Sequence, residues 1–171
     1  MANIWSNLRR IARHRWYSVR NTIRGAIPAP LQERLEQQVA NSEQRHSGQI
    51  RICVESALPV SYLWRQASAR ERAITLFGKL RVWDTEHNNG VLIYLLLADR
   101  AIEVVADRGV RIPGAQWEAM VKRLGGALAA GQWEQGLFQA LEAVSTLMAV
   151  EWPVDPPAAR TNELPDRPWV R

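Results

Sequence analysis

The sequence has few of the features that hold a chain together or anchor it without a hydrophobic core. It contains one cysteine, Cys53, which alone can form neither an internal disulfide nor a structural zinc site. The longest unbroken apolar run covers residues 91–98, far fewer than the ~20 residues that a membrane-spanning helix needs. With 171 residues, 47% of them hydrophobic and 23% charged, the chain has the composition of one globular domain.

Catalytic signatures are also missing. There is no nucleophile elbow, no glycine-rich phosphate-binding loop and no HExxH motif. His14 and His87 have no partner at a recognisable spacing, and His46 is expected at the carboxyl end of a helix, where it can interact with the last carbonyl groups. Cys53 falls in a predicted buried strand and is interpreted as a core residue. We identify no complete catalytic constellation and therefore favour a protein that is not an enzyme.

Acidic residues are absent from the first 30 positions, which contain six arginines. The other 141 residues carry 16 basic and 17 acidic side chains, so the net charge of +5 belongs to the N-terminal arm. A nucleic-acid-binding domain normally carries basic residues on the domain itself. We therefore rank nucleic-acid binding through the arginine arm last among the functions considered.

Residues 4–24 of this arm have the periodicity of an amphipathic helix. Leu8, Ala12, Trp16 and other apolar residues share the side of Ile4, and most arginines lie opposite, Arg15 excepted. The expected membrane or partner surface consists of Trp5, Leu8, Arg9, Arg13, Trp16, Arg20, Ile23 and Arg24.

Two outcomes are open for this helix. Its apolar stripe, Ile4, Leu8, Trp16, Val19 and Ile23, can pack on the domain or on a second copy of the chain. Alternatively, the stripe can lie in the headgroup region of an anionic membrane, with the arginines contributing electrostatic attraction. Arginines interrupt each apolar stretch that could form the core of a secretory signal, so we expect a cytoplasmic protein, peripheral at the inner membrane.

The rest of the sequence alternates between helical and strand patterns. Helices are predicted from residue 31 to before Gly48, over 60–81, and around 117–128 and 133–148. Strands are predicted at 49–56, with one face better buried, at 91–97, covered on both faces, and at 101–106, forming an antiparallel hairpin with the preceding strand. This order implies a mixed sheet with helices on both faces.

We divide the chain into a basic helical extension (1–30), a domain (31–150) and a proline-rich tail (151–171) that is extended or disordered.

An ordered set of short motifs resembles the TPM domain family, which includes plant photosystem II repair proteins and many bacterial proteins. The motifs are WDTEHNNGVLI at 83–93, ADR at 98–100, IEV at 102–104 and DRGV at 107–110. The upstream segment 42–51, with SE, RHSG and IR, is similar to a soluble bacterial branch of the family. The resemblance covers about residues 31–150 and implies a three-layer α/β/α sandwich with a small mixed sheet that includes one antiparallel hairpin.

The resemblance also suggests chemistry, because plant members are associated with acid phosphatase activity and some members bind calcium at the acidic loop before the NGVL strand. The candidate metal ligands here are Asp84, Glu86, Asn88, Asn89, Asp99 and Asp107. Calcium-binding members commonly have an Asp where this chain has Asn88, so we expect a calcium affinity no better than about millimolar. The favoured interpretation of Asn88-Asn89-Gly90 is a turn of residues that tolerate positive φ.

Three functions follow from these observations. The first is a TPM-like accessory or interaction protein that acts at the cytoplasmic membrane face in the assembly or maintenance of a membrane complex. Its partner would be the membrane surface or a membrane-associated protein, with the N-terminal helix also able to form a homo-oligomer. The alternative is a weak calcium- or magnesium-dependent phosphatase in which Asp84, Glu86, Asp99 and Asp107 hold the cation. The third is nucleic-acid binding through the arm.

Overall fold

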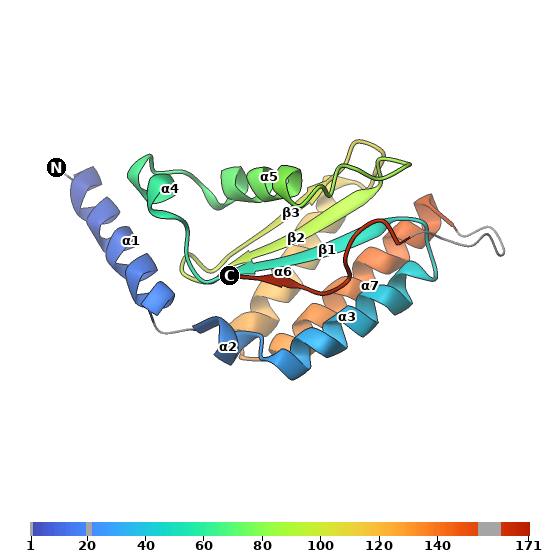
Figure 1. The fold of residues 1–171 in the computed structure, drawn as a ribbon, viewed down its shortest axis with the longest axis horizontal. Coiled ribbons are helices and arrows are strands. Elements are labelled where there is room, and N and C mark those ends of the chain that lie inside the picture. The colour runs from blue at the N-terminus through green and yellow to red at the C-terminus, as the bar shows by residue number, and fades with distance from the viewer. Residues whose placement is uncertain (1, 20–21, 154–161) are drawn as a thin grey trace.

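A four-stranded mixed sheet forms the centre of the protein. The computed structural model describes residues 2–19, 22–153 and 162–171, and its sheet has the strand order β3-β2-β1-β4 (Figure 1). The strands are β1 (Gln49–Glu55), β2 (Gly90–Leu96), β3 (Ala101–Ala106) and β4 (Trp169–Val170). β1 is parallel to β2 and to β4, whereas β2 and β3 form the predicted antiparallel hairpin.

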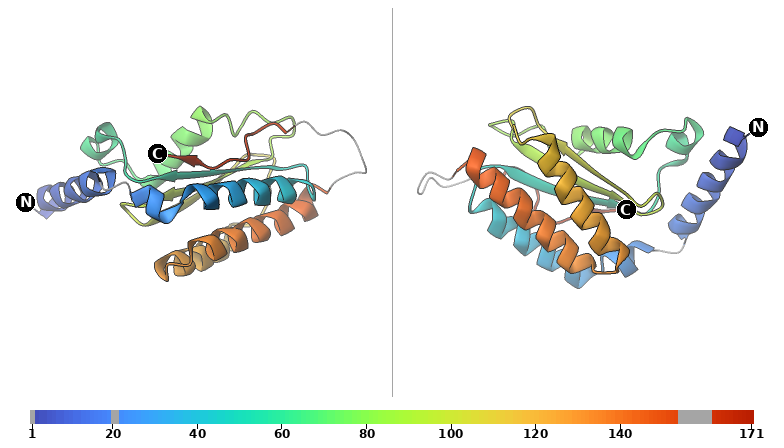
Figure 2. Two further views of the ribbon diagram at one scale, coloured as in Figure 1. Left: turned by 60° about the horizontal axis from the view of Figure 1, so that its bottom comes forward. Right: turned by 180° about the vertical axis from the view of Figure 1, so that it is seen from behind.

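Helices cover both faces of this sheet (Figure 2). One face carries α3 (Ala29–Glu43), α6 (Gly114–Ala129) and α7 (Trp133–Glu151). The other carries α4 (Val60–Trp64) and α5 (Ala69–Lys79), both in the crossover from β1 to β2. The predicted α/β/α sandwich is therefore confirmed. Two N-terminal helices, α1 (Ala2–Val19) and α2 (Thr22–Ala26), precede this body.

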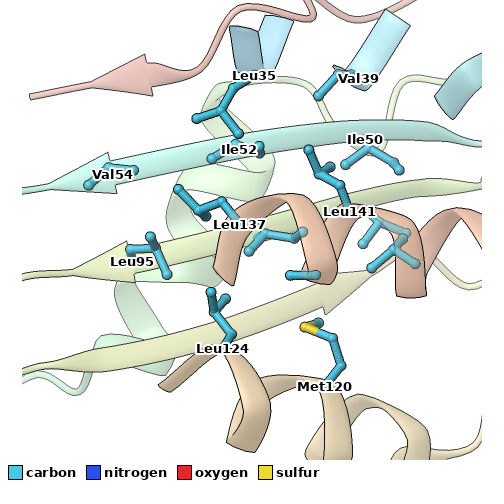
Figure 3. Close-up of a cluster of buried hydrophobic side chains, with 14 of the residues drawn as sticks. Leu35, Val39, Ile50, Ile52, Val54, Leu95, Met120, Leu124, Leu137 and Leu141 are labelled. Atoms are coloured by element: carbon cyan, nitrogen blue, oxygen red, sulfur yellow. The ribbon is translucent and has the colours of Figure 1, made fainter. Parts of the chain in front are cut away.

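The side chains of β1 and β2 alternate between two hydrophobic cores, as the pleat of a strand requires. Ile52, Ile93 and their neighbours of the same parity pack against α3, α6 and α7, and Figure 3 shows this larger core. Cys53 and Leu92 face α5 on the other side. All seven residues of β1 are buried, so the expectation that one face of this strand is less buried was wrong.

The predicted helix over 60–81 is divided into α4 and α5 by residues 65–68. Gln66 has a positive φ of 56°, which ends α4. A capping box then begins α5, because the Ser68 hydroxyl accepts a hydrogen bond from the Glu71 N–H and Glu71 accepts one from the Ser68 N–H.

The described part of the C-terminal tail, residues 162–171, belongs to the sheet. Trp169 and Val170 form β4, and the Gln49 amide oxygen accepts hydrogen bonds from the backbone of Glu163 and Leu164 at 3.0 Å each. The Arg51 guanidinium donates to the carbonyls of Pro165 and Arg167. These residues are ordered against β1, and Trp169 and Val170 have the extended conformation of a strand. Residues 154–161 lie outside the described part.

Ile27, which the sequence analysis assigned to the N-terminal extension, is fully buried in the larger core. It follows α2 and leads through Pro28 into α3. The body of the protein therefore begins before residue 31.

Candidate functional site

The carboxyl ends of the parallel strands β1, β2 and β4 lie at one end of the sheet, and α1 lies at the same end beside α4 (Figure 1). In open α/β sheets, ligands bind preferentially outside the carboxyl ends of the strands. This end also includes the turn between β2 and β3, where Asp99 is located. We therefore take this end of the sheet as the candidate site.

Asp99 holds α1 against the body through three side chains. Arg10 donates to Asp99 Oδ2 from Nε at 3.1 Å and from Nη2 at 2.8 Å, while Arg13 pairs with Oδ1. His14 Nε2 lies 3.0 Å from the same Oδ1. We call Arg10, Arg13, His14 and Asp99 the Asp99 clamp. Arg10 also donates to the Ala67 carbonyl at 2.8 Å, which adds a second attachment.

His14 is the buried member of the Asp99 clamp, with 1% of its surface exposed. The Leu58 N–H donates to His14 Nδ1 at 3.0 Å, so the ring proton is on Nε2 and is donated to Asp99. Burial lowers the pKa of His14, although the hydrogen bond to Asp99 opposes this shift. The geometry therefore fits a neutral imidazole that donates at one nitrogen and accepts at the other.

The pKa of Asp99 results from two opposing causes. Burial raises it, but the hydrogen bonds from Arg10, His14 and Arg13 together outweigh burial and lower the pKa to about 2. Asp99 is therefore an anion at neutral pH, and its charge is compensated by the two arginines.

The face by which α1 docks is the opposite of the one predicted for packing. Leu8, Trp16 and Val19 of the apolar stripe are 51%, 56% and 77% exposed. His14 and the partly buried Ile11 face the body instead. Of the outcomes left open for the stripe, packing on the domain does not occur for these residues, whereas packing on a second copy and binding to a membrane stay predictions. Helical periodicity shows which residues share a face, but it does not show that a carboxylate on the domain will bind the other face.

The remaining residues of the predicted surface have different positions. Arg9 and Arg24 are exposed, and Arg13 is half-exposed although it is part of the Asp99 clamp. Ile23 is on α2, where it packs against the larger core. The side chain of Trp5, that of Ile4 and residue Arg20 lie outside the described part.

The six candidate metal ligands do not come together. Asp99 follows the end of β2, whereas Asn88 and Asn89 precede its start, so the two groups are separated by the length of the strand, roughly 20 Å. Asp107 follows β3 and lies at the same end as Asn88. The set of four acids that the phosphatase alternative requires is therefore not assembled, because Asp99 belongs to the Asp99 clamp.

The loop before β2 is held by hydrogen bonds to neighbouring segments. Asn88 has a φ of 53°, which agrees with the turn interpretation, and its Oδ1 accepts a hydrogen bond from Arg108 Nε at 3.2 Å. The Asn89 side chain donates to the Ser47 carbonyl at 3.2 Å. Gly109 packs so closely here that a Cβ on it would lie 2.5 Å from the Asn88 carbonyl oxygen.

A calcium ion does not fit these residues well. Asn89 Oδ1 and Asp107 Oδ2 are buried and have no hydrogen-bond partner among the described residues, but the Arg108 guanidinium already places a positive charge on Asn88. Asp84 is half-exposed, 3.8 Å from Arg81. Within residues 2–19, 22–153 and 162–171, no three His, Cys, Asp or Glu side chains form a group that could hold a metal ion.

Sequence reasoning missed a buried ionic network near the carboxyl end of β1. Glu55 Oε2 accepts hydrogen bonds from Arg72 Nε and from the Tyr94 hydroxyl, both at 2.8 Å. The pKa of Arg72 is raised by the hydrogen bond to Glu55, and burial raises the pKa of Tyr94. Burial also raises the pKa of the neighbouring Cys53 thiol, in keeping with its interpretation as a core residue. The network joins β1, β2 and α5, and no sequence motif indicated it.

The other two histidines have structural partners. His46 is fully buried, with Nδ1 3.0 Å from the Gly48 carbonyl and Nε2 3.1 Å from the Ser42 hydroxyl. The ring of His87 stacks on Trp152 with the centroids 5.8 Å apart. These partners are a hydroxyl, a backbone carbonyl and an aromatic ring.

Comparison with solved structures shows the same fold in two bacterial proteins. The solution structure of the BA42 protein from the psychrophilic bacterium Bizionia argentinensis has 23% identity and a TM-score of 0.69, covering 84% of this chain and 94% of that one. The N-terminal domain of a protein from P. gingivalis has 17% identity and a TM-score of 0.60, covering 77% and 83%. No curated protein matches the chain.

The sequence itself shows the family. A profile of the TPM domain matches residues 23–147, which is most of the chain and includes Ile27 and α3. The segments on which the resemblance was based, from Ser42 to Val110, all fall within this range. The chain therefore belongs to the TPM domain family.

Proposed function

We propose that this protein is a non-enzymatic TPM-type accessory protein that binds an anionic membrane surface through the outward face of α1. In that position its domain would take part in the assembly or maintenance of a membrane complex at the cytoplasmic face. The observation that supports this function is the orientation of α1, which attaches to the body by its polar side and leaves Leu8, Trp16 and Val19 exposed. Docking on the domain and binding to a membrane are therefore compatible.

The composition of the outward face suits the interface of a membrane. At about 100° per residue, Leu8, Val19 and Trp16 form a stripe with Arg15 on one side and Arg9 on the other. Such a helix buries its apolar stripe at the level of the headgroups, and each arginine near an anionic surface contributes ~1 kcal/mol. No helix in the described part of the chain is long and apolar enough to span a bilayer, so the proposed contact is peripheral.

The neighbouring helix α4 extends this apolar surface. Val60 and Trp64 are 69% and 78% exposed, and α4 contacts α1. Most of the large exposed apolar side chains in the described residues therefore lie on two adjacent helices. Tryptophan is enriched at membrane interfaces, and Trp16 of α1 and Trp64 of α4 are both exposed.

Vesicle sedimentation tests the proposal. The full-length protein is mixed with neutral phosphatidylcholine vesicles or with vesicles that also contain phosphatidylglycerol. We expect sedimentation with the anionic vesicles only, and weaker association at high salt, because arginine attraction is screened. Equal binding to both vesicle types, or to neither, contradicts the proposal.

A matched pair of double variants identifies the surface. Leu8→Ser with Trp16→Ser removes the outward stripe, whereas Ile74→Ser with Trp83→Ser removes side chains of the same kind and similar exposure, 52% and 50%, elsewhere. We expect the first variant to lose most binding, at least about tenfold, and the second to bind like the wild type. Equal losses in both variants would mean that general surface hydrophobicity, not α1, drives the association.

A further inference from the structure

A cavity of about 360 Å³ lies between the N-terminal helices and the body, next to the Asp99 clamp. Tyr17 of α1 and Ala26 of α2 form one wall, Leu97 and Ile102 from the β2–β3 hairpin form another, and Leu128 and Trp133 close the side of α6 and α7. Its volume is within the range of small-molecule sites, and its lining is mostly apolar.

Small residues create this space. Ala101, Gly125 and Ala129 all line it. Glycine weakens the interior of a helix relative to alanine, so a glycine within α6 calls for a reason. Packing does not supply one, because a Cβ on Gly125 would meet only Ile102 Cδ1, at 3.6 Å. The missing side chain leaves volume that the protein does not fill.

Among the described residues that line the cavity, Arg100 is the one charged side chain and none is acidic. Arg100 is exposed and has a φ of 50° in the turn after β2. Its neighbour Asp99 is already bound by Arg10, Arg13 and His14. Within the described part of the chain, the Arg100 guanidinium has no ion pair or hydrogen bond, so its charge is available to an anion.

We propose that this cavity binds a free single-chain amphiphile with an anionic head, such as an alkyl carboxylate. The alkyl chain lies along Leu97, Ile102 and Trp133, and the head is paired with Arg100. This site goes beyond the proposed membrane function, because it uses the inward side of α1 and not its exposed stripe.

Isothermal titration calorimetry of the full-length protein with dodecanoate, below its critical micelle concentration, tests the site. We expect saturable binding with one ligand per chain. Dodecyltrimethylammonium, which has a similar chain and the opposite charge, should bind at least about tenfold more weakly. Arg100→Gln should weaken dodecanoate binding and reduce the preference for the anionic over the cationic amphiphile. Absence of saturable dodecanoate binding, or equal binding of the two amphiphiles, overturns the proposal.

Two adjacent glycines of α6 provide a matched pair of variants. Gly125→Leu places a side chain in the cavity, whereas Gly126→Leu places the same side chain at an exposed position with no atom within 4 Å of its Cβ. We expect Gly125→Leu to lose dodecanoate binding and Gly126→Leu to keep it, with both variants folded in urea unfolding. Undiminished binding by Gly125→Leu would place the ligand elsewhere and overturn the proposal.

The same variants separate this site from membrane binding. The double variant Leu8→Ser with Trp16→Ser should bind dodecanoate like the wild type but lose binding to anionic vesicles. Gly125→Leu should lose dodecanoate binding and keep vesicle binding. If both variants lose both ligands together, the amphiphile and the bilayer lipid use one surface, and the separate cavity site is rejected.

Discussion

At the scale of single residues, three titratable side chains with altered pKa values make structural contacts. Asp99 and His14 attach α1, and Glu43 fixes the start of β1, since Glu43 Oε1 accepts a hydrogen bond from the Ile50 N–H at 2.7 Å. Each group changes protonation on folding, so each makes stability depend on pH. The pH effect of Glu43 is opposite in sign to that of His14 and Asp99, so the two contributions to stability can be measured separately.

Acid should loosen the docking of α1. The pKa of His14 is lowered by burial, so the undocked arm takes up a proton below about pH 6.5 that the docked arm does not, and docking weakens as the pH falls. Protonation of Asp99 removes the stabilisation of docking that its carboxylate provides, between about pH 4 and pH 2. Hydrogen exchange of residues 7–19, corrected for intrinsic rates, should show lower protection at pH 5 than at pH 7. His14→Gln should remove this difference; a difference that persists in the variant rules out His14 as its source.

Glu43 should have the opposite effect. Burial raises its pKa to about 8, so the folded protein keeps a proton that the unfolded chain releases above about pH 4.5. Stability from this group is full below pH 4.5 and declines as the pH rises to about 8, at up to ~1.4 kcal/mol per pH unit. Urea unfolding at pH 5, 7 and 9 should show that Glu43→Gln reduces the decline of the unfolding free energy with pH. Glu33→Gln, at an exposed position of the same helix, should leave this decline unchanged. An unchanged slope in Glu43→Gln contradicts the assignment.

At the scale of elements, the strands differ in burial because they differ in position in the sheet. β2 lies between β1 and β3, and all seven of its residues are buried, whereas five of the six residues of the edge strand β3 are only partly buried. The unbroken apolar run at 91–97 predicted this covering on both faces. No sequence pattern indicated which face of α1 contacts the body, because this depends on where the turn between β2 and β3 places Asp99.

Ile93→Ala should cost about 2–5 kcal/mol of unfolding free energy, because Ile93 is fully buried in the larger core and the cavity left behind cannot collapse completely. Ile102→Ala, on β3 and only partly buried, should cost less. Urea unfolding measures both. A loss below about 1 kcal/mol for Ile93→Ala would mean that β2 is not the packed centre of the sheet.

At the scale of the whole molecule, the strands with long apolar patterns and the order of helices were predictable, and the fourth strand was not. β4 has only two residues and follows several prolines, so its periodicity is too short to detect. Its place depends on Gln49 and Arg51, whose polar side chains on β1 bind the returning backbone more than 100 residues away in the sequence. The capping box at Ser68 and Glu71 was visible in the sequence and could have located the break between α4 and α5.

Deleting residues 162–171 should therefore destabilise the entire sheet. Gln49 and Arg51 would lose their partners and the outer edge of β1 would be open, at a cost of about 2 kcal/mol or more. Urea unfolding and light scattering should show a less stable chain that also self-associates, because an uncovered strand edge pairs with other chains. A deletion variant as stable and monomeric as the full chain would show that β4 contributes nothing to the fold.

The parallel pairing of β4 with β1 also has a consequence during synthesis. β1 leaves the ribosome long before β4. Helices α1 to α7 are made before or between them, so the nascent protein can assemble both cores while one side of its sheet is still uncovered. Until residues 169–170 emerge, the backbone of residues 53 and 54 is open to strands of neighbouring nascent chains. The charge of Arg51 discourages such pairing during this interval, since a foreign strand would have to supply the carbonyl groups that Pro165 and Arg167 later provide.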